Sequence, residues 1–352
     1  MAPVAKIIGI ATAPSSVKKF PSTIKVMKLP RLFPVLFALV LPLFAQAQKF
    51  TIAVVPKGTT HEYWKSIHAG AVKAQRELAA SGVTVDIIWK GPLKEDDREQ
   101  QVQVIENFIG RHVDGIVLAP LDDRALVAPV ETAVRGKIPV VIIDSDLATK
   151  AYASFVATDN REGGRIAARH LGKLLGGKGN AIMLRYAVGS ASTEEREAGF
   201  LEVMKKDFPG IRLLSTDQHA GATRDTAKAA AENLLSRYGQ SLDGVFASNE
   251  SSAAGMLLAL RDAGLARGKV KFVAFDSGET LNGGLKAGDI QGMVVQNPLN
   301  MGYLGVKTVV AVLRGEKVQR RIDTGVGFVT LENFNDPAMA DIVNPPLEKY
   351  LE

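Results

Sequence analysis

The sequence predicts an α/β protein made of two similar doubly wound parallel-sheet lobes. The prediction depends on a pattern that occurs twice, first as Val113-Asp114-Gly115-Ile116 and again as Leu242-Asp243-Gly244-Val245. Each copy is followed by an apolar run that ends in an aspartate, which is Asp144 in the first copy and Asp276 in the second. Asp114 and Asp243 are 129 residues apart, and Asp144 and Asp276 are 132 residues apart, so the two copies have nearly the same spacing. Paired lobes of this kind set the carboxyl ends of both sheets around one cleft, where open α/β sheets bind ligands.

The first copy alternates short apolar runs with amphipathic stretches. Runs rich in β-branched residues predict strands, and apolar positions at helical spacing predict helices. The expected elements are a strand over 50–55, a polar loop over 57–62, a helix over 63–78, a strand over 83–89, a helix over 98–110, a strand over 115–119, a helix over 123–135 and the strand that runs into Asp144. This alternation predicts a parallel sheet with right-handed crossovers.

The second copy repeats the order element for element. It predicts strands over 180–184, 211–215, 244–248 and 270–275, with helices over 193–207, 223–238 and 251–263. After Asp276 the sequence predicts a helix over 281–287, a strand over 291–295, a helix over 301–313 and an extended stretch over 322–331.

The basic charge of the chain comes from its first 47 residues. The whole sequence has a formal net charge of +6, from 43 Lys and Arg against 37 Asp and Glu. Residues 1–47 hold six of the basic side chains and no acidic one, so the remainder has 37 of each sign. Bulk charge therefore gives no support for nucleic-acid binding.

Residues 1–47 are predicted to be a leader and a cleaved signal peptide. Met27-Lys28-Leu29-Pro30-Arg31 is a positive n-region, 32–44 is apolar, and Ala45-Gln46-Ala47 is a small-residue cleavage site. Cleavage after Ala47 predicts a periplasmic protein. A membrane anchor is the alternative, but thirteen apolar residues with two prolines fall short of the roughly 20 that span a bilayer. Residues 1–26 precede a better-placed methionine and look like an extended or misassigned start.

No sequence pattern supports catalysis, a cofactor or a metal. Because the chain has no cysteine, it has neither disulfides nor a lipid-bearing cysteine. His61-Glu62-Tyr63-Trp64-Lys65 begins like a zinc-protease motif but lacks the second histidine. Gly176-Gly177-Lys178-Gly179 precedes a strand, whereas a phosphate loop follows one. We therefore expect no enzyme activity, no cofactor and no metal site.

Asp144 and Asp276 are the first candidate site residues. Each closes an apolar run, so each is expected just beyond the carboxyl edge of a buried parallel strand. Each could instead cap a following helix, a position that aspartate favours. Their equivalent places in the two lobes favour ligand contact, because carboxylates accept hydrogen bonds from hydroxyl groups, which a sugar offers at fixed angles.

Three candidates come from the second copy. Arg196 follows the Gly189-Ser190 loop. It is expected either to form an ion pair with neighbouring glutamates at the surface or to donate hydrogen bonds from its planar guanidinium to sugar oxygens. Asn249 follows a strand and Gln296 ends one. Their amides both donate and accept hydrogen bonds, as hydroxyl groups do.

Two aromatic residues begin the first helix. Tyr63 and Trp64 are expected either to pack in the core or to stack on the apolar faces of a sugar ring. The weaker candidates for ligand contact are Lys57, Thr60 and His61 from the loop ahead of them, and Ser145 beside Asp144.

The chain resembles the periplasmic sugar-binding proteins of ABC transporters, of the ribose-binding type, which share their fold with the effector domain of lactose-repressor-like regulators. The resemblance covers nearly all of residues 50–330. It depends on several motifs that are specific only in combination. These are 50–55, which the aromatic pair follows along the chain, and 113–116, 139–144, 158–160, 195–200, 246–250, 272–276 and 294–298.

The resemblance implies a site and a hinge. The residues implied to line the sugar site are Tyr63, Trp64, Asp144, Arg196, Asn249, Asp276 and Gln296. Three hinge segments near 156–159, 296–298 and 323–326 are implied to cross between an N-terminal lobe of 48–157 plus 297–324 and a C-terminal lobe of 158–296 plus 325–352. The ligand would close the lobes by hinge bending. The chain departs from ribose binders at two positions. Ribose binders commonly have an arginine where this chain has Ser145, and an aromatic residue near the position of Ala222.

The sequence thus predicts a monomeric periplasmic receptor that binds a monosaccharide or related polyol between its lobes. It would deliver this ligand to an ABC permease in the inner membrane through a transient contact, with no nucleic-acid partner. A sugar or signal-molecule sensor that docks onto a chemoreceptor or sensor kinase would use the same fold. A secreted glycosidase would use Asp144 and Asp276 as an acid/base pair. A transcription regulator is disfavoured, since no DNA-binding helices precede the first strand.

Overall fold

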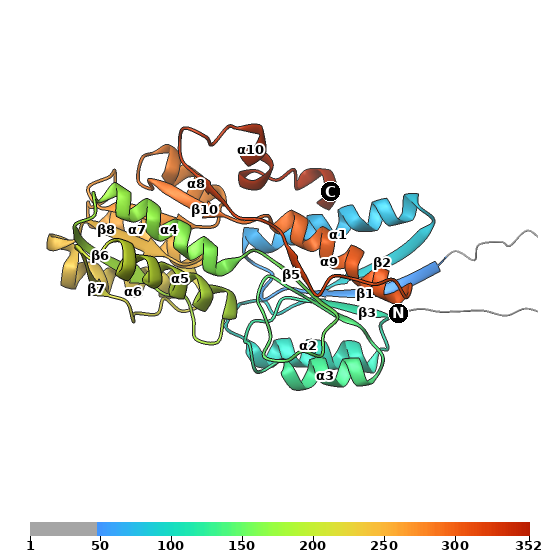
Figure 1. The fold of residues 1–352 in the computed structure, drawn as a ribbon. Coiled ribbons are helices and arrows are strands. Elements are labelled where there is room, and N and C mark those ends of the chain that lie inside the picture. The colour runs from blue at the N-terminus through green and yellow to red at the C-terminus, as the bar shows by residue number, and fades with distance from the viewer. Residues whose placement is uncertain (1–47) are drawn as a thin grey trace, which may run out of the picture. The chain divides into compact units, whose positions relative to one another are not determined.

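The computed structural model describes residues 48–352, in which two six-stranded sheets are each covered by helices on both faces (Figure 1). The predicted leader and signal peptide, residues 1–47, lie outside the described residues. Each sheet forms the centre of one lobe, and the chain crosses between the sheets three times. The predicted fold class is therefore confirmed.

The first lobe has the strand order β11-β5-β4-β3-β1-β2, and every strand pair in it is parallel. Helices α1 and α9 pack on one face of the sheet, and α2 and α3 pack on the other. Its elements are β1 (Gln48–Val55), α1 (Glu62–Ala80), β2 (Val83–Trp89), α2 (Arg98–Gly110), β3 (Gly115–Leu118), α3 (Val127–Arg135), β4 (Val140–Ile143), β5 (Ser154–Ala157), α9 (Pro298–Leu313) and β11 (Arg321–Asp323).

The second lobe has the matching order β12-β10-β9-β8-β6-β7. Helices α4 and α5 pack on one face of its sheet, and α6, α7 and α8 pack on the other. Its elements are α4 (Asn160–Leu174), β6 (Gly179–Leu184), α5 (Ala191–Asp207), β7 (Ile211–Ser215), α6 (Arg224–Tyr238), the 3-10 helix η1 (Gly239–Ser241), β8 (Gly244–Ala247), α7 (Glu250–Asp262), β9 (Lys271–Phe275), α8 (Glu279–Lys286), β10 (Gly292–Val295) and β12 (Gly327–Val329), followed by α10 (Pro337–Val343) and α11 (Glu348–Leu351).

The repeated Asp-Gly pair has the same structural role in both lobes. Asp114 Oδ2 accepts a hydrogen bond from the backbone N–H of Thr51 at 2.7 Å, and Asp243 Oδ2 accepts one from Asn180 at 2.7 Å. Each aspartate therefore ties the start of the third strand of its lobe to the first strand. The repeat in the sequence is thus a repeat of sheet register.

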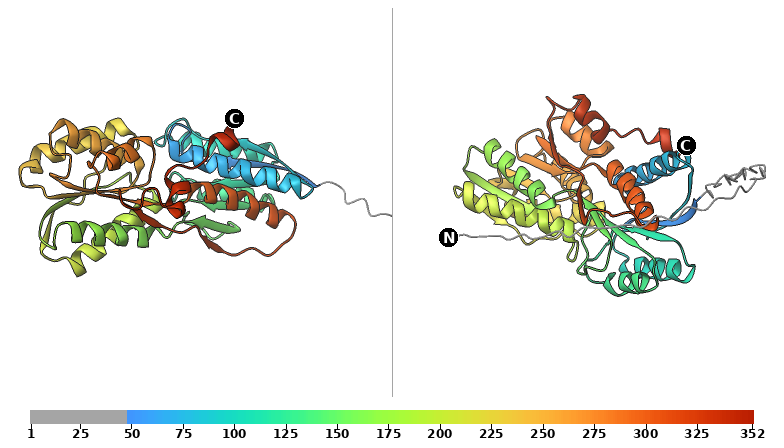
Figure 2. Two further views of the ribbon diagram at one scale, coloured as in Figure 1. Left: turned by 90° about the horizontal axis from the view of Figure 1, so that it is seen from above. Right: turned by 45° about the vertical axis from the view of Figure 1, so that its right-hand side comes forward.

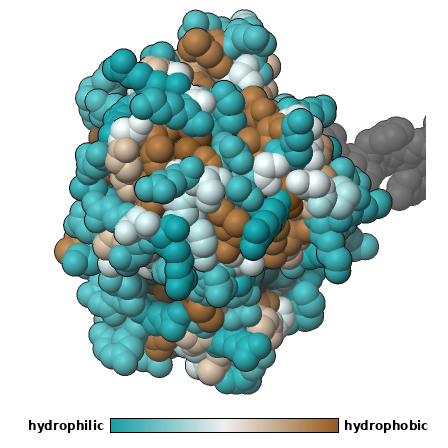
Figure 3. Space-filling model, turned by 90° about the vertical axis from the view of Figure 1, so that its left-hand side faces the viewer, coloured by the Kyte–Doolittle hydropathy of each residue, from teal (hydrophilic) through white to brown (hydrophobic). Residues whose placement is uncertain are grey.

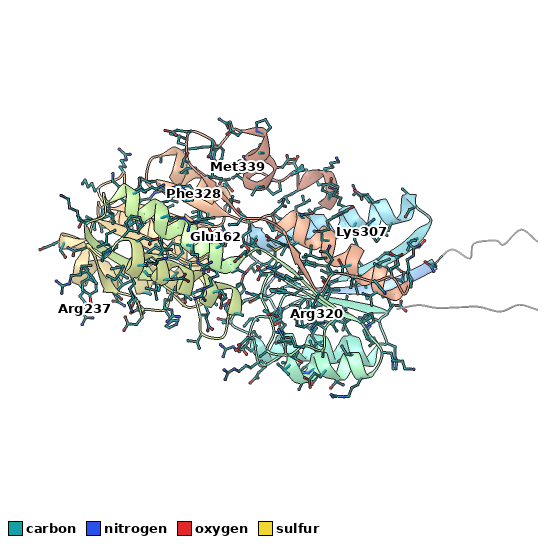
Figure 4. All side chains as sticks on the ribbon, in the orientation of Figure 1. Glu162, Arg237, Lys307, Arg320, Phe328 and Met339 are labelled. Carbon is teal, nitrogen blue, oxygen red and sulfur yellow. The ribbon has the colours of Figure 1, made fainter. Side chains whose placement is uncertain are left out.

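Three segments of the chain cross from one sheet to the other. They join β5 to α4, β10 to α9 and β11 to β12, and the views in Figure 2 show the lobes on either side of them. In Figure 4, Arg320 and Phe328 mark the third crossing, just before β11 and within β12. The stack of His170 on Phe328, with ring centroids 3.5 Å apart, attaches the end of this crossing to α4.

Strand β12 departs from the expected parallel order, because it is antiparallel to β10. The carboxyl ends of both sheets face the same cleft. A chain that leaves β11 at this edge and continues after Thr324–Val326 therefore enters the second sheet from its carboxyl edge. It must then run against the other strands there.

Other differences from the prediction are local. The helix expected over 123–135 begins only at Val127, because Asp122 Oδ1 accepts hydrogen bonds from the backbone N–H of Arg124 and Ala125 and holds a turn. Helix α4 and the C-terminal helices were not predicted. Helix α11 lies against α1, where Arg76 donates to the carbonyl of Lys349 at 2.6 Å.

Closely packed helix pairs occur in both lobes. A Cβ atom on Gly70 of α1 would lie 1.9 Å from the carbonyl oxygen of Leu299 of α9, and one on Gly164 of α4 would lie 1.8 Å from that of Arg196 of α5. Only glycine permits this approach of two backbones. In the second lobe the approach sets the position of Arg196.

The surface is mixed. Figure 3 looks onto the end of the molecule at the left of Figure 1, where hydrophilic residues surround hydrophobic ones near the centre of the face. In residues 48–352, none of the helices has the length and apolar character needed to cross a membrane.

Candidate functional site

A cavity of about 30 Å³ lies between the carboxyl ends of the two sheets. All seven of the predicted site residues line it, together with Lys57 and His61. Thr60 and Ser145, the other two weak candidates, do not line it. Five lining residues were not predicted: Glu95, Tyr186, Ser192, Thr193 and Glu250. This free volume is well below the range for small-molecule pockets, about 300–1,000 Å³, so the lining side chains fill most of the site in this arrangement of the lobes.

Asp144 follows β4 and accepts hydrogen bonds from two groups of its own lobe. Tyr63 donates its hydroxyl to Oδ1 at 2.8 Å, and the Lys57 ammonium lies 3.0 Å from Oδ2. Burial, followed by the charges of Asp144 and Asp276, raises the pKa of Tyr63 well above 10, so this phenol is a neutral donor. No helix begins at Asp144, because the chain continues through a loop into β5.

Asp276 follows β9 and is held by the second lobe and the hinge. Gln296 Nε2 donates to Oδ1 at 2.7 Å, and the backbone N–H of Glu250 donates to Oδ2 at 3.1 Å. The helix-cap alternative does not hold, since the cap of α8 is Gly278. Burial raises the pKa of Asp276, against the opposing charge of Arg196.

Arg196 is a buried residue of α5 and does not pair with the neighbouring glutamates. Its side chain is 2% exposed, and Nη1 lies 3.7 Å from Asp276 Oδ2. Its Nε donates to Asn160 Oδ1 at 2.8 Å, and Nη1 donates to the carbonyl of Ser248 at 3.0 Å. The guanidinium carbon lies 3.9 Å from the centroid of the Phe275 ring. This cation is therefore held in the cavity by fixed hydrogen bonds.

Glu95, from the loop between β2 and α2, connects both lobes inside the cavity. It accepts hydrogen bonds from the Trp64 indole at 2.6 Å and from the Tyr186 hydroxyl, on the opposite lobe, at 2.6 Å. His61 Nδ1 lies 2.8 Å from the same carboxylate. Trp64 also packs in the hydrophobic core of the first lobe, so both roles considered for it are compatible.

The pair formed by His61 and Glu95 has opposite pKa shifts. Burial by itself lowers the pKa of His61, but the hydrogen bond and charge of Glu95 outweigh it and raise the pKa above 6.5. Burial by itself raises the pKa of Glu95, but its donors, His61 first, bring it below 4.5. Both shifts favour the ion pair.

Asn249 combines two roles. Its Oδ1 caps α7 by accepting from the backbone N–H of Ser252 at 3.3 Å, while the residue lines the cavity. Glu250, the next residue, is buried, and Arg224 donates to its Oε1. Burial raises the pKa of Glu250, and the charge of Arg224 opposes this.

The lobes contact each other around the cavity. Lys57 Nζ donates to Ser190 Oγ at 3.3 Å and to Ser192 Oγ at 3.2 Å across the cleft, and the backbone N–H of Ser192 donates to Ser145 Oγ at 3.0 Å. Ser145 thus contributes to lobe contact rather than to the cavity wall. The lobes are in a closed arrangement.

At the two departures from ribose binders, other residues of this chain supply a cation and an aromatic ring to the cavity. At Ser145 there is no arginine, but Lys57 places a cation beside Asp144. Ala222 does not line the cavity, and Tyr186 places an aromatic ring there from the second lobe. Lys57 was among the weaker candidates from the sequence, whereas Tyr186 was not predicted.

The sequence contained a partial signal for the residues that were missed. Glu250 directly follows Asn249, and Tyr186 follows strand β6 as Asp144 follows β4, so both lie at carboxyl ends of strands or starts of helices. Glu95 lies in an acidic, polar loop that reads as solvated surface. Its burial depends on three donors that only the fold brings together.

Comparison with known proteins agrees with this geometry. The family model described as "Periplasmic binding protein domain" matches residues 52–317. The D-ribose/D-allose-binding protein of Pseudomonas aeruginosa is 29% identical over 80% of this chain and 89% of its own length. The ribose import binding protein RbsB of Haemophilus influenzae is 30% identical over 84% of this chain and 96% of its own.

Solved structures show the same relationship. A carbohydrate transporter solute-binding protein from Agrobacterium radiobacter, in complex with D-arabinose, is 36% identical with a TM-score of 0.79, covering 85% of this chain and 100% of that one. An ABC transporter solute-binding protein from Agrobacterium vitis with bound D-fucose is 34% identical with a TM-score of 0.79, covering 83% of this chain and 99% of that one. From these matches and the fold, the chain belongs to the periplasmic binding protein domain family, among the sugar-binding proteins of ABC transporters.

Proposed function

We propose that the protein binds a monosaccharide or related polyol between its lobes and delivers it to the permease of an ABC importer. The observation that carries the proposal is the convergence of Asp144 and Asp276, from equivalent strand ends of the two lobes, on one cavity with Arg196 between buried partners. Sugar hydroxyls both donate and accept hydrogen bonds, so carboxylates, an amide and a guanidinium complement them.

The aromatic residues supply the remaining contacts. Tyr63, Trp64 and Tyr186 line the cavity from two lobes, and their ring surfaces suit the apolar faces of a sugar ring. We propose that Tyr186 and the seven predicted residues, Tyr63 and Trp64 among them, contact the ligand, with Lys57 and His61 in support. Two relatives with known structures bind D-arabinose and D-fucose, and two others are named for D-ribose or D-allose.

Ligand capture would require opening of the lobes. We propose that the three crossings are the hinge between lobes of 48–157 plus 297–324 and 158–296 plus 325–352. Closure around the ligand removes the cleft from water, which strengthens the hydrogen bonds of buried charged groups. The permease would then recognise the closed protein, which acts as a monomer without chemical change to its ligand.

A binding screen tests this proposal. The purified protein is heated with D-ribose, D-allose, D-arabinose, D-fucose, polyols and inositols, because a bound ligand raises the unfolding midpoint by mass action. The ligand that gives the largest shift is titrated by calorimetry, and mass spectrometry of the recovered sugar checks that it is unchanged. No shift with any of these compounds would contradict the proposal, and turnover of a glycoside would favour the glycosidase alternative.

The cellular location is a separate part of the proposal. We propose export to the periplasm with cleavage after Ala47, so that the mature protein begins at Gln48. Mass spectrometry of the protein released by osmotic shock should give the N-terminal peptide that starts at Gln48. Retention in the membrane fraction would favour the anchor alternative.

A further inference from the structure

Two hydrogen-bond acceptors in the cavity have no partner within the protein. Glu250 Oε2 and Gln296 Oε1 are buried without a hydrogen bond, and both side chains, each 3% exposed, line the cavity. Buried polar atoms in folded proteins are nearly always paired. Two unpaired acceptors in one cavity therefore indicate that a bound molecule supplies the donors.

The free atom of Gln296 is fixed by its neighbour. Its Nε2 donates to Asp276 Oδ1 at 2.7 Å. Exchange of the amide nitrogen and oxygen would place the amide oxygen against a carboxylate oxygen, where neither has a proton to donate. The oxygen of Gln296 must therefore remain the free group.

The free atom of Glu250 is fixed in the same manner. Arg224 donates to Oε1, and the backbone N–H of Glu250 is engaged by Asp276. His61 does not supply a hydrogen bond to Oε2, because its Nδ1 is 3.8 Å away and lies at 2.8 Å from Glu95. An ion pair with Arg224 accounts for one carboxylate oxygen and leaves the burial of the other unexplained.

The protein engages only part of the cationic donors of the cavity. Lys57 Nζ contacts Asp144, Ser190 and Ser192, while Arg196 uses two of its five N–H groups on Asn160 and Ser248. The free atoms of Glu250 and Gln296 are both acceptors, and both residues also donate to Asp276. A ligand carboxylate placed against these two atoms would meet acceptor oxygens only.

We propose that Glu250 and Gln296 form a subsite that selects a hydrogen-bond donor on the ligand. It accepts a hydroxyl or ammonium group of a sugar and rejects a sugar acid whose carboxylate would occupy the same place. The inference rests on the proposed function and deepens it, because it assigns two side chains to one part of the ligand and excludes a class of sugars.

The substitution Glu250→Gln tests this subsite sharply. Arg224 must face the amide oxygen of the new side chain, since a guanidinium cannot accept a hydrogen bond. The amide NH₂ then stands where Oε2 was, so the variant replaces a free acceptor with a donor. Glu232→Gln, on the exposed surface of α6, is the matched control.

The probes are D-ribose, D-allose, D-arabinose and D-fucose, titrated by calorimetry into wild-type protein and both variants. The sugar that binds most tightly is then compared with its monodeoxy derivatives and with its sugar acid. In wild-type protein one deoxy derivative should bind about 10- to 100-fold more weakly than the parent sugar, which is the usual range for a hydrogen bond to a charged group. In Glu250→Gln that difference should disappear, and the affinity of the acid relative to the parent should rise. Glu232→Gln should behave as wild type.

The outcomes separate this inference from the proposed function. If Glu250→Gln binds the parent sugar and every derivative as wild type does, or only lowers the unfolding temperature, Glu250 has a structural role and the subsite is wrong. The proposed function still stands in that case, provided that Asp276→Asn loses binding. If no probe binds wild-type protein, the proposed function itself fails.

Discussion

Asp144 and Asp276 have the same left-handed backbone at equivalent strand ends, with φ angles of 63° and 73°. Left-handed backbone is uncommon outside glycine and is found at functional sites, where the surrounding structure maintains it. Here it keeps each carboxylate in the cavity rather than at the start of a helix. The partners differ, however, because Asp144 lies against the Lys57 ammonium at 3.0 Å, whereas Asp276 lies against an amide at 2.7 Å.

This difference predicts that the two aspartates respond differently to neutralisation. Asp144→Asn removes the counter-charge of Lys57, whose side chain is 5% exposed. Breaking one half of a buried ion pair costs about 3–5 kcal/mol. Asp276→Asn removes the counter-charge of the buried Arg196, whose guanidinium lies 3.7 Å away, but it also relieves the burial cost that raises the pKa of Asp276. It should therefore lower the unfolding temperature less than Asp144→Asn does.

Both variants should lose sugar affinity, by about 10- to 100-fold for a hydrogen bond to a charged group. Calorimetric titration measures the loss, and thermal unfolding without ligand measures the stability. Equal unfolding temperatures for the two variants would contradict the role given to Lys57, and unchanged binding by Asp276→Asn would remove Asp276 from the site.

The hydrogen bond from Tyr186 to Glu95 should stabilise the closed lobes. Tyr186→Phe removes the hydroxyl that joins the second lobe to the first and keeps the ring in the cavity. Since ligand affinity falls with the fraction of closed protein, we expect the dissociation constant to rise about tenfold. Small-angle X-ray scattering should show a larger radius of gyration in the variant without ligand.

Tyr152→Phe is the matched control for this prediction. Tyr152 donates to Asp146 at 2.7 Å inside the first lobe, so its loss should lower stability without a change in affinity or radius. An equal effect of both substitutions on affinity would show that the bond to Glu95 has no special part in closure.

The pair of His61 and Glu95 predicts a pH window of stability. Because the pKa of His61 is raised in the folded state, protonated His61 contributes its whole stabilisation below pH 6.5, and this contribution is lost as the pH rises through the pKa of the folded state. Because the pKa of Glu95 is lowered in the folded state, ionised Glu95 contributes its whole stabilisation above pH 4.5, and this contribution is lost as the pH falls through the pKa of the folded state. The pair should therefore contribute most between these two values.

His61→Gln measures this contribution. The difference in unfolding temperature between wild type and variant should be largest near pH 5.5, midway between the ordinary values of 4.5 and 6.5, and should shrink above neutrality. A difference that is constant with pH would mean that the proton on His61 does not matter. His68→Gln serves as the control, since burial alone lowers the pKa of that histidine.

The helix contact at Gly164 predicts a combined loss of stability and affinity. The Cβ of Gly164→Ala would lie 1.8 Å from the carbonyl oxygen of Arg196, so α4 and α5 must separate. Overpacking of this kind costs about 1–3 kcal/mol or more, and it shifts Arg196 away from Asp276. Thermal unfolding and calorimetry should both show the change.

Gly283→Ala in α8 is the control for Gly164→Ala. No atom lies within 4 Å of the added Cβ, and alanine favours a helix over glycine by about 1 kcal/mol. We expect equal or greater stability and unchanged affinity. A similar loss in both variants would contradict the close-contact argument.

Several elements of the fold followed from the sequence. The strand at 83–89 and the helix at 98–110 have the predicted bounds, because their hydrophobic periodicity is strong and local. Helix α4 was missed since many of its buried positions are small: Gly163 lies against Phe275 of β9, Gly164 lies against α5, and Ala167 and Ala168 are buried in the core. The antiparallel direction of β12 depends on how the lobes face each other, which no local pattern carries.

The sequence by itself determined the duplicated scaffold and the seven residues that line one cavity, because strand ends in a parallel sheet share an edge. The tertiary structure alone decided which groups are paired and which are free. Glu95 is buried because residues from both lobes donate to it, and Glu250 keeps an unpaired oxygen because Arg224 reaches only one side of its carboxylate. Hydrogen-bond partners distant in sequence are set by packing, and packing exists only in the folded chain.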